Sequence, residues 1–247
     1  MVLSTRVTIQ WLPEEADELT STMVLSTPRD LFTDVRVFKD HYPYKKSSTV
    51  EPIEEVFQFV SIGWEEEIKG TNKLRFHTSV NLQEIVKSGR TGKPLEECQA
   101  EPDIGAFWPI EGTEDRKETG AMENPATGKV TEYVEVWRSL NPEETAPNEE
   151  VREGHWKGDE REVRVRVFDT DSNGFSGRIV RLGNWVQGVL FETGAEYPLS
   201  VMRSFYNETS GEWTSLIEYG EREFPNIYKE WEINQEDANG IIWKRVE

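Results

Sequence analysis

Two stretches of this sequence, far apart in the chain, repeat one pattern of turn and strand. The first runs from Asn124 to Val136 and the second from Asn207 to Tyr219. Both read N-x-x-[ST]-G-x-[VW]-T-x-x-[VI]-E, a glycine-containing turn that opens into β-branched and aromatic residues, which is typical of a β-hairpin. A unit repeated at this separation predicts two copies of one β domain, and therefore a double β-barrel.

Alternation of apolar and polar residues dominates the rest of the chain. Val35 and Val37, for example, lie on the opposite side of their segment from Arg36, as expected for a half-buried strand. Pro, Gly, Asn and Asp separate many short segments of this kind, which favours a sandwich or a barrel. Helix is scarce: we expect a short one from Asn81 to Lys87, capped by Asn81, and another turn from Phe224 to Trp231. The predicted class is all-β with minor helix, built as two tandem antiparallel barrels.

A polar segment rich in proline and acid separates the two copies of the repeat. It runs from Asn141 to Glu150 and contains no residues that could build a core, so it is the expected linker. We therefore predict an N-terminal barrel domain over residues 1–145 and a C-terminal barrel domain over residues 151–247.

The net charge of the chain limits the classes of partner that we expect it to bind. The formal net charge is −19, and such a field repels phosphate backbones and anionic membrane surfaces, so we expect neither nucleic acid nor membrane. The same charge favours a basic protein partner. There is one cysteine, Cys98, which excludes an intramolecular disulfide and indicates a reducing compartment. With no secretion signal at the N-terminus, we expect a cytoplasmic location.

Several segments resemble a fungal family, here called Hri-one-like, of proteins with two lipocalin-like barrels. They occur in the family's order and span nearly the whole chain. The matching segments are Ser21–Phe38, Glu118–Ala121 with Val134–Arg138, Leu182–Leu190 and Asn239–Trp243. The resemblance implies a double calycin-type barrel, a cytoplasmic or nuclear setting and contact with a casein-kinase-type partner. It brings no agreed catalytic residue, so no site is carried over from it.

Motifs for metal or cofactor binding are missing from the sequence. His41, His77 and His155 are isolated from one another and Cys98 lies in a charged segment, whereas zinc needs His or Cys ligands at close spacing. The sequence also contains no P-loop, dinucleotide fingerprint or nucleophile elbow. We therefore expect no metal and no cofactor.

Paired carboxylates remain as candidates for chemistry. Glu135 and Glu218 occupy equivalent positions in the two copies of the repeat. If they point into a barrel, each would have a raised pKa and could move protons without a cofactor. If the neighbouring Val134, Val136 and Ile217 point inward instead, both carboxylates are solvated, and the alternation favours this second arrangement.

Aromatic residues and one arginine are the candidate ligand contacts. Aromatic walls are usual in pockets for apolar ligands, and an inward arginine would orient an anionic ligand or pair with an inward glutamate. The expected ligand-binding residues are Trp64, Tyr133, Trp137, Trp185 and Arg203.

Three functions are compatible with this sequence. The first is a barrel that binds a small apolar molecule in its cavity. The second is a cofactor-independent isomerase, cyclase or lyase of fungal secondary metabolism, since a dry pocket with one acid and one base suffices for proton transfer. The third is an acidic interaction protein that docks a basic or kinase-type partner. An open pocket with a Glu–Tyr or Glu–Arg pair would favour the enzyme, a smooth apolar pocket simple binding, and filled barrels the docking role.

Overall fold

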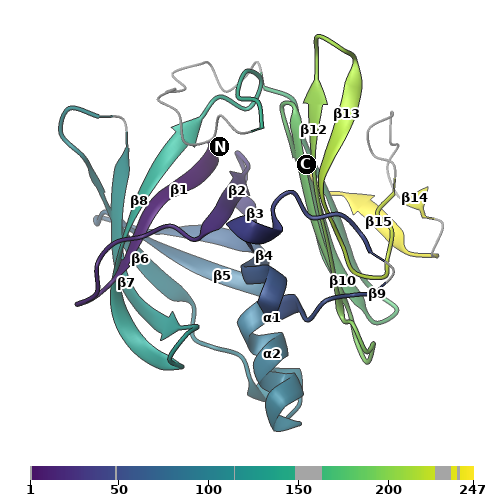
Figure 1. Ribbon diagram of the computed structural model, residues 1–247, viewed down its shortest axis with the longest axis horizontal. Helices are drawn as coiled ribbons and strands as arrows, with labels where there is room; N and C mark the ends of the chain where they lie inside the picture. Colours follow the sequence, from purple (N-terminus) through teal and green to yellow (C-terminus); the bar gives the residue numbers. More distant parts are fainter. Residues whose placement is uncertain (1, 48, 114, 148–162, 226–234, 238–239) are drawn as a thin grey trace.

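The computed structural model describes the chain except for residues 1, 48, 114, 148–162, 226–234 and 238–239. Strands dominate it (Figure 1). They are β1 (Val2–Trp11), β2 (Thr20–Ser26), β3 (Leu31–Phe38), β4 (Phe57–Ile68), β5 (Lys73–Asn81), β6 (Asp103–Pro109), β7 (Arg116–Asn124), β8 (Lys129–Leu140), β9 (Val165–Ser172), β10 (Phe175–Leu182), β11 (Trp185–Glu192), β12 (Leu199–Asn207), β13 (Glu212–Tyr219), β14 (Gln235–Glu236) and β15 (Ile242–Arg245).

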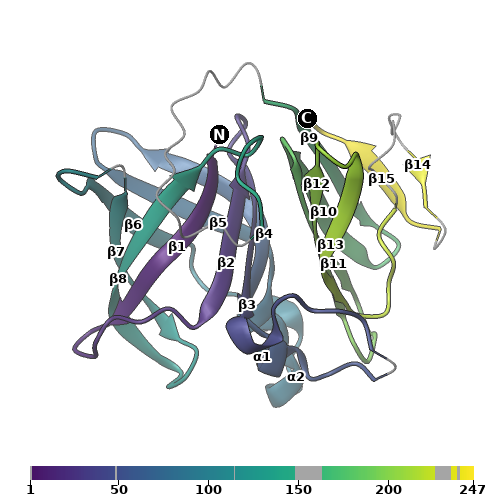
Figure 2. The same ribbon diagram turned by 45° about the horizontal axis from the view of Figure 1, so that its top comes forward.

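The strands form two separate sheets (Figures 1 and 2). Strands β1 to β8 follow one another round a closed barrel, and β8 pairs with β1 in antiparallel fashion. The later strands form a seven-stranded sheet in the order β13-β12-β11-β10-β9-β15-β14. The prediction of a mostly β protein is confirmed. A second closed barrel is not: in the described part of the chain, no pairing joins β13 to β14.

The repeated sequence pattern forms two hairpins of the same construction. Strands β7 and β8 are joined after Asn124, and strands β12 and β13 after Asn207. In each turn the asparagine side chain accepts a hydrogen bond from a backbone N–H two residues on. Its carbonyl accepts one, 2.8 Å long, from the glycine four residues on, Gly128 or Gly211. Both glycines have positive φ, which a side chain would strain. The predicted hairpins are therefore confirmed.

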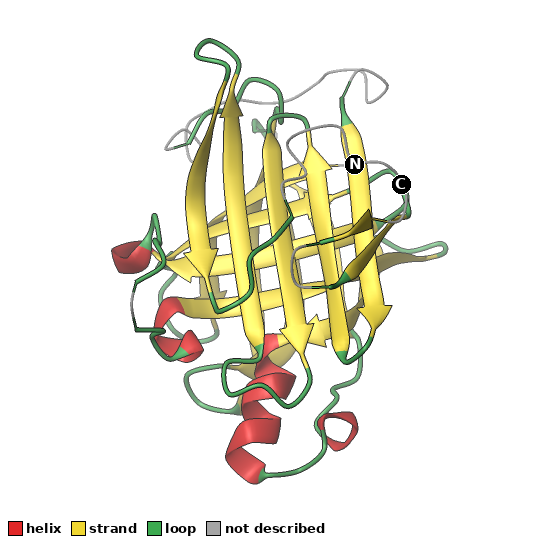
Figure 3. Cartoon of the chain, turned by 90° about the vertical axis from the view of Figure 1, so that its right-hand side faces the viewer, coloured by secondary structure: helices red, strands yellow, loops and turns green. Residues whose placement is uncertain are grey.

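The main apolar core lies between the barrel and the second sheet. Side chains on the outer face of the barrel strands, such as Leu25 and Val35, pack against Trp185, Val189 and others of the sheet. Figure 3 shows the strands of the sheet crossing those of the barrel behind them. Because these barrel strands are covered from outside as well, β3 is buried along most of both faces. The apolar side of the sequence alternation therefore faces the second sheet, and the polar side faces the barrel interior.

Polar side chains of the second sheet reach across this core to the barrel backbone. Arg203 donates to the carbonyl of Val35 at 2.8 Å, and Gln187 donates to that of Thr33 at 3.2 Å. Arg178 donates to the carbonyl of Gly63. Since buried polar groups are costly unless they are hydrogen-bonded, these contacts fix how the sheet sits on the barrel.

The other face of the second sheet is also covered by apolar side chains. Phe168, Val186 and Met202 form a cluster there with Ile241 and Trp243 from the end of the chain. Trp243 is fully buried, and β15 pairs with β9. The second sheet thus has packed side chains on both of its faces.

Helices are few and short. Helix α2 (Leu82–Thr91) begins where predicted, because the side chain of Asn81 accepts from the N–H of Gln83 at 2.9 Å. It continues past Lys87 to Thr91, and Gly92 is its C-cap, with positive φ. The others are α1 (Ile53–Val56) and the 3₁₀ turns η1 (Lys39–His41) and η2 (Leu95–Glu97). None of the described helices has the length and apolar character needed to cross a membrane. Most of the turn expected at Phe224–Trp231 lies outside the described residues.

A candidate ligand cavity in the N-terminal barrel

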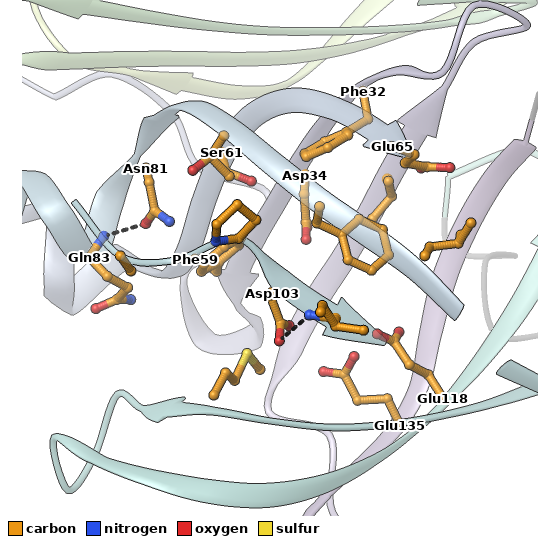
Figure 4. Close-up of a pocket in the computed structure, with 18 of the residues that line it drawn as sticks. Phe32, Asp34, Phe59, Ser61, Glu65, Asn81, Gln83, Asp103, Glu118 and Glu135 are labelled. Atoms are coloured by element: carbon orange, nitrogen blue, oxygen red, sulfur yellow. Dashed lines mark hydrogen bonds between the residues drawn. The ribbon is translucent and has the colours of Figure 1, made fainter. Parts of the chain in front are cut away.

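The barrel encloses a cavity of about 570 Å³, a volume in the range of small-molecule sites. Figure 4 shows acidic side chains from several strands turned toward its middle. Aromatic side chains are prominent in its walls, and its centre is charged. The walls include Phe32, Phe59, Phe76, Phe107, Tyr133 and Trp137, and the central groups include Asp34, Arg36, Asp103, Glu118 and Glu135.

Glu135, on β8, is held by two buried arginines. Its Oε1 accepts from Arg6 at 2.6 Å and from Arg36 at 3.1 Å. Arg6 also donates to Glu18 at 2.6 Å and to Gln58 at 2.7 Å. Arg6 comes just before the register shift of β1 against β8, and such bulges redirect side chains. The carboxylate of Glu135 is therefore fixed in place at the cavity wall, with 2 % of the residue exposed.

Arg36 joins this carboxylate to the aromatic wall. Its guanidinium forms a two-pronged contact with Asp34, with Nη2 and Oδ2 2.7 Å apart. The same group lies 4.8 Å from the ring centre of Phe59 and 5.5 Å from that of Trp137, a cation–π geometry. Burial alone would lower the pKa of Arg36, but the carboxylates of Asp34 and Glu135 outweigh it and raise the pKa. Arg36 is therefore a permanent cation that is already paired.

Glu118, on β7, belongs to a second cluster with neutral partners. Its Oε2 accepts from Trp137 Nε1 at 2.8 Å, and its Oε1 lies 3.0 Å from the hydroxyl of Tyr133. The same hydroxyl lies 3.1 Å from Oδ2 of Asp103. Tyr133 thus bridges two carboxyl groups, Glu118 and Asp103, and its single hydroxyl hydrogen can be donated to either of them.

Two strand glycines leave the space that this cluster occupies. A Cβ on Gly120 would lie 2.5 Å from the hydroxyl of Tyr133, and a Cβ on Gly105 would lie 2.1 Å from Oε1 of Glu118. Any side chain at either position would displace the cluster. Glycine inside a strand often marks such a close approach.

Burial and mutual repulsion raise the pKa of Glu118 and so favour its protonated form. Burial, followed by the nearby charge of Glu135, its cross-strand neighbour, raises the pKa of Glu118 to about 8. Burial also raises the pKa of Asp103, and burial together with Glu118 raises that of Tyr133. The cavity therefore contains a neutral carboxylic acid beside an arginine-bound glutamate, which is an arrangement suited to proton transfer.

The structure separates the two glutamates that the repeat makes equivalent. Glu135 lies in the cavity, contrary to the orientation that the alternation favours, but Glu218 lies at the surface near Lys45. A register shift in the pairing of β12 with β13 causes this. Because of it, the consecutive residues Leu216 and Ile217 both pack against the barrel, and Glu218 then points away. Glu218 therefore has the solvated position that the alternation favours, whereas Glu135 does not.

The expected ligand contacts also divide into two groups. Tyr133 and Trp137 line the cavity, whereas Trp185 and Arg203 are fully buried between the barrel and the second sheet. Trp64 is 45 % exposed and stacks on His77 at 4.7 Å between ring centres. Trp64, Trp185 and Arg203 therefore lie outside the cavity.

Sequence reasoning did not select Glu118, Asp103 or Arg6 for the site. Two signals were present in the segment Glu118–Ala121: it is one of the family-like stretches, and it has a glycine inside a strand. Among the described residues, no group of three or more His, Cys, Asp or Glu side chains is placed to hold a metal ion.

Comparisons with known proteins agree with the family resemblance. A family model described as Protein HRI1 matches residues 2–247. A crystal structure of an uncharacterized protein from Saccharomyces cerevisiae superposes with a TM-score of 0.74 at 18 % identity, covering 100 % of this chain and 98 % of the other. At that identity the similarity concerns the fold alone. A search of curated proteins finds no match.

Proposed function

The chain belongs to the family described as Protein HRI1, and from this premise we propose that its N-terminal barrel binds one small, largely apolar molecule. The observation that carries the proposal is the cavity of about 570 Å³, in which aromatic and aliphatic side chains surround a charged centre. Apolar walls supply most of the affinity for such ligands, and a few placed polar groups fix their orientation.

Two buried polar atoms at the cavity wall lack hydrogen-bond partners among the described residues, which supports the presence of a bound molecule. Ser61 is 1 % exposed and its hydroxyl lines the cavity, yet it has no hydrogen-bond partner among the described residues. The same holds for Nε of Arg116. Buried polar atoms without partners are rare in folded proteins, because each one costs free energy. A ligand would supply the missing partners.

A fluorescent apolar dye tests this proposal directly. Nile red should bind the wild-type chain with a stoichiometry of one. Val24→Trp places an indole in the cavity, because Val24 lines it, and should abolish binding. Val136→Trp makes the same change on a β8 residue outside the lining and should leave binding intact. Absence of dye binding, or equal binding by Val24→Trp, would contradict the proposal.

A second candidate function is cofactor-independent proton transfer in the same cavity. It is favoured by Glu118, whose pKa is raised to about 8 by burial and by Glu135, and by the Glu118–Tyr133 and Glu135–Arg36 pairs. An extract of the protein's own cells, incubated in deuterated water, should contain a metabolite that gains deuterium with wild-type protein. The Glu118→Gln variant should not produce this labelling. Labelling that is the same with both proteins, or absent with wild type, would reject the candidate.

The division into domains 1–145 and 151–247 is also a proposal. It is supported by the strand pairing, since the barrel strands all precede Asn141 and the strands of the second sheet all follow Arg164. Limited proteolysis should cut first between residues 141 and 150, giving two fragments that remain associated through the apolar core. A first cut within 163–190 would count against this division.

A further inference from the structure

The two carboxyl groups bridged by Tyr133 have no cationic partner. The guanidinium of Arg6 is committed to Glu18 and Glu135, and that of Arg36 to Asp34 and Glu135. Among the described residues, no Lys, Arg or His nitrogen lies within salt-bridge distance of Glu118 or Asp103; their partners are hydroxyl, indole and backbone N–H groups. A buried carboxyl group without a cation favours its protonated form, and a positive charge brought into this part of the cavity would stabilise the ionised form of either group.

The surroundings of the two carboxyl groups suit an organic cation. The rings of Tyr133, Phe76 and Phe107 line the same cavity, and aromatic rings attract ammonium groups through their faces. A metal ion requires several oxygen ligands around one point, whereas the described residues offer no such group. An ammonium group has three N–H donors, and the carboxyl oxygens of Glu118 and Asp103 can accept from them.

The mouth of the cavity also favours a positive ligand. Exposed residues of the lining come from α2, from β6 and the segment before it, and from the β7–β8 hairpin. They include Ile104, 38 % exposed, and Val130, 77 % exposed. The exposed charges among them are Glu101, Glu123 and Lys87, an excess of negative charge on a chain whose net charge is −19. Such a field concentrates cations at the entrance.

A second observation, independent of the acidic cluster, points to a ligand. Ser61, 1 % exposed, lines the cavity from β4 with an unpartnered hydroxyl. In Figure 4 it lies beside its cross-strand partner Asp34, on the side of the drawn residues opposite to Glu118 and Glu135. A molecule that bonds Ser61 and also reaches Glu118 must span the cavity and have polar atoms at both of its ends.

We propose that the ligand is an organic amine with an apolar body, whose ammonium group is bound by Glu118 and Asp103. This inference rests on the proposed binding function and adds the chemical class of the ligand. The main alternative is an organic anion held by Arg116, which lines the cavity and lies over the ring of Phe107.

Three indole compounds of matched shape distinguish these ligand classes. Tryptamine, tryptophol and indoleacetate share one apolar body and carry an ammonium, a hydroxyl or a carboxylate group. By isothermal titration calorimetry on the full chain, tryptamine should bind at least about tenfold more tightly than tryptophol, as expected for a charge-assisted contact. Equal binding of the two, or no binding of tryptamine, would overturn the inference. Tighter binding of indoleacetate would overturn it in favour of Arg116.

Variants locate the preference within the cavity. Glu118→Gln should reduce the tryptamine preference by about tenfold. Glu132→Gln makes the same change on an exposed β8 residue outside the lining, and should leave the preference unchanged. A preference that survives Glu118→Gln would overturn the assignment. Nile red binding measured in parallel separates the two claims: if the dye binds and tryptamine does not, only the amine inference fails.

The pH dependence of wild-type binding provides a readout that needs no variant. Because Glu118 must lose its proton to pair with an ammonium, tryptamine affinity should rise as pH increases toward about 8. The charged and titratable groups that face Glu118 from the surrounding strands are Arg6, Asp34, Arg36, Glu65, Asp103, Arg116, Tyr133 and Glu135. Calorimetry in buffers of different ionisation enthalpy should show proton release on binding. Proton uptake, or affinity that falls over this range, would contradict the inference.

Discussion

The β7–β8 and β12–β13 hairpins begin with the same turn, but their glutamates have different environments. Glu135 is 2 % exposed and is bound by Arg6 and Arg36, whereas the side chain of Glu218 is 47 % exposed and lies 3.7 Å from Lys45. The difference arises from the register shift at Leu216, which only the second hairpin has within its pairing. A repeated sequence can therefore set the turn and the strand without setting which face each residue occupies, because one inserted residue reverses the faces.

The largest expected contrast between the two hairpins concerns these glutamates. Glu135→Ala leaves two buried guanidiniums without their shared carboxylate and should lower the free energy of unfolding by about 3–5 kcal/mol. Glu218→Ala removes an exposed contact and should change it by less than about 0.5 kcal/mol. Urea unfolding followed by tryptophan fluorescence measures both. Similar losses in the two variants would show that the hairpins are not distinguished in this way.

Phenylalanine truncations compare the packed core with the cavity wall. Phe205 is buried between barrel and sheet and its ring lies 5.0 Å from that of Trp185. Phe205→Ala should cost about 3 kcal/mol or more, since it creates a void in a packed region. Phe76→Ala should cost roughly half of that or less, because Phe76 already borders the cavity. If the two losses measured by urea unfolding were equal, the barrel interior would be as closely packed as the core.

The pH dependence of stability should have opposite sign in the two regions. The folded pKa of Glu118 is raised to about 8, so its stabilising contribution is present at low pH and is lost as pH rises from about 4.5 to 8. Glu118→Gln should therefore remove a decline of up to about 1.4 kcal/mol per pH unit. In the second sheet, Arg222 lowers the pKa of Glu192, so Glu192→Gln should remove stability that wild type loses as pH falls. Unfolding curves from pH 4 to pH 9 test both signs.

The smallest predicted effect concerns the turns of the two hairpins, which should lose similar amounts of stability. Asn124→Ala and Asn207→Ala each remove the side-chain acceptor for the backbone N–H two residues on, and Asn207 accepts in addition from the N–H of Ser210 at 3.2 Å. Each should lower the free energy of unfolding by about 1 kcal/mol, as measured by urea unfolding. Losses that differ by more than about 1 kcal/mol would mean that the turns are not energetically equivalent.

Local signals in the sequence predicted local structure well. The Asn–Gly turns, the alternating strands and the cap at Asn81 all depend on neighbouring residues, and each is confirmed. The family resemblance is confirmed as well. The expected cytoplasmic or nuclear location and the basic or kinase-type partner stay predictions.

The candidate site could be predicted only in part, for a physical reason. Alternation shows that Val35 and Arg36 lie on opposite faces, but it does not show which face meets water, a ligand or another sheet. Here the apolar face meets the second sheet, so charged residues turn inward. The pairing of Glu135 with Arg6 joins residues 129 positions apart, which no local pattern can indicate. Tyr133 and Trp137 were selected for their aromatic character, which is common to wall and core residues.

Native mass spectrometry of the protein isolated from its own cells tests most directly whether the N-terminal barrel is an occupied binding site. The wild-type chain and Val136→Trp should each retain one small molecule, whereas Val24→Trp should be recovered without it. A folded wild-type protein that carries no adduct, or an adduct kept equally by Val24→Trp, would contradict the account of a ligand-binding cavity in the barrel.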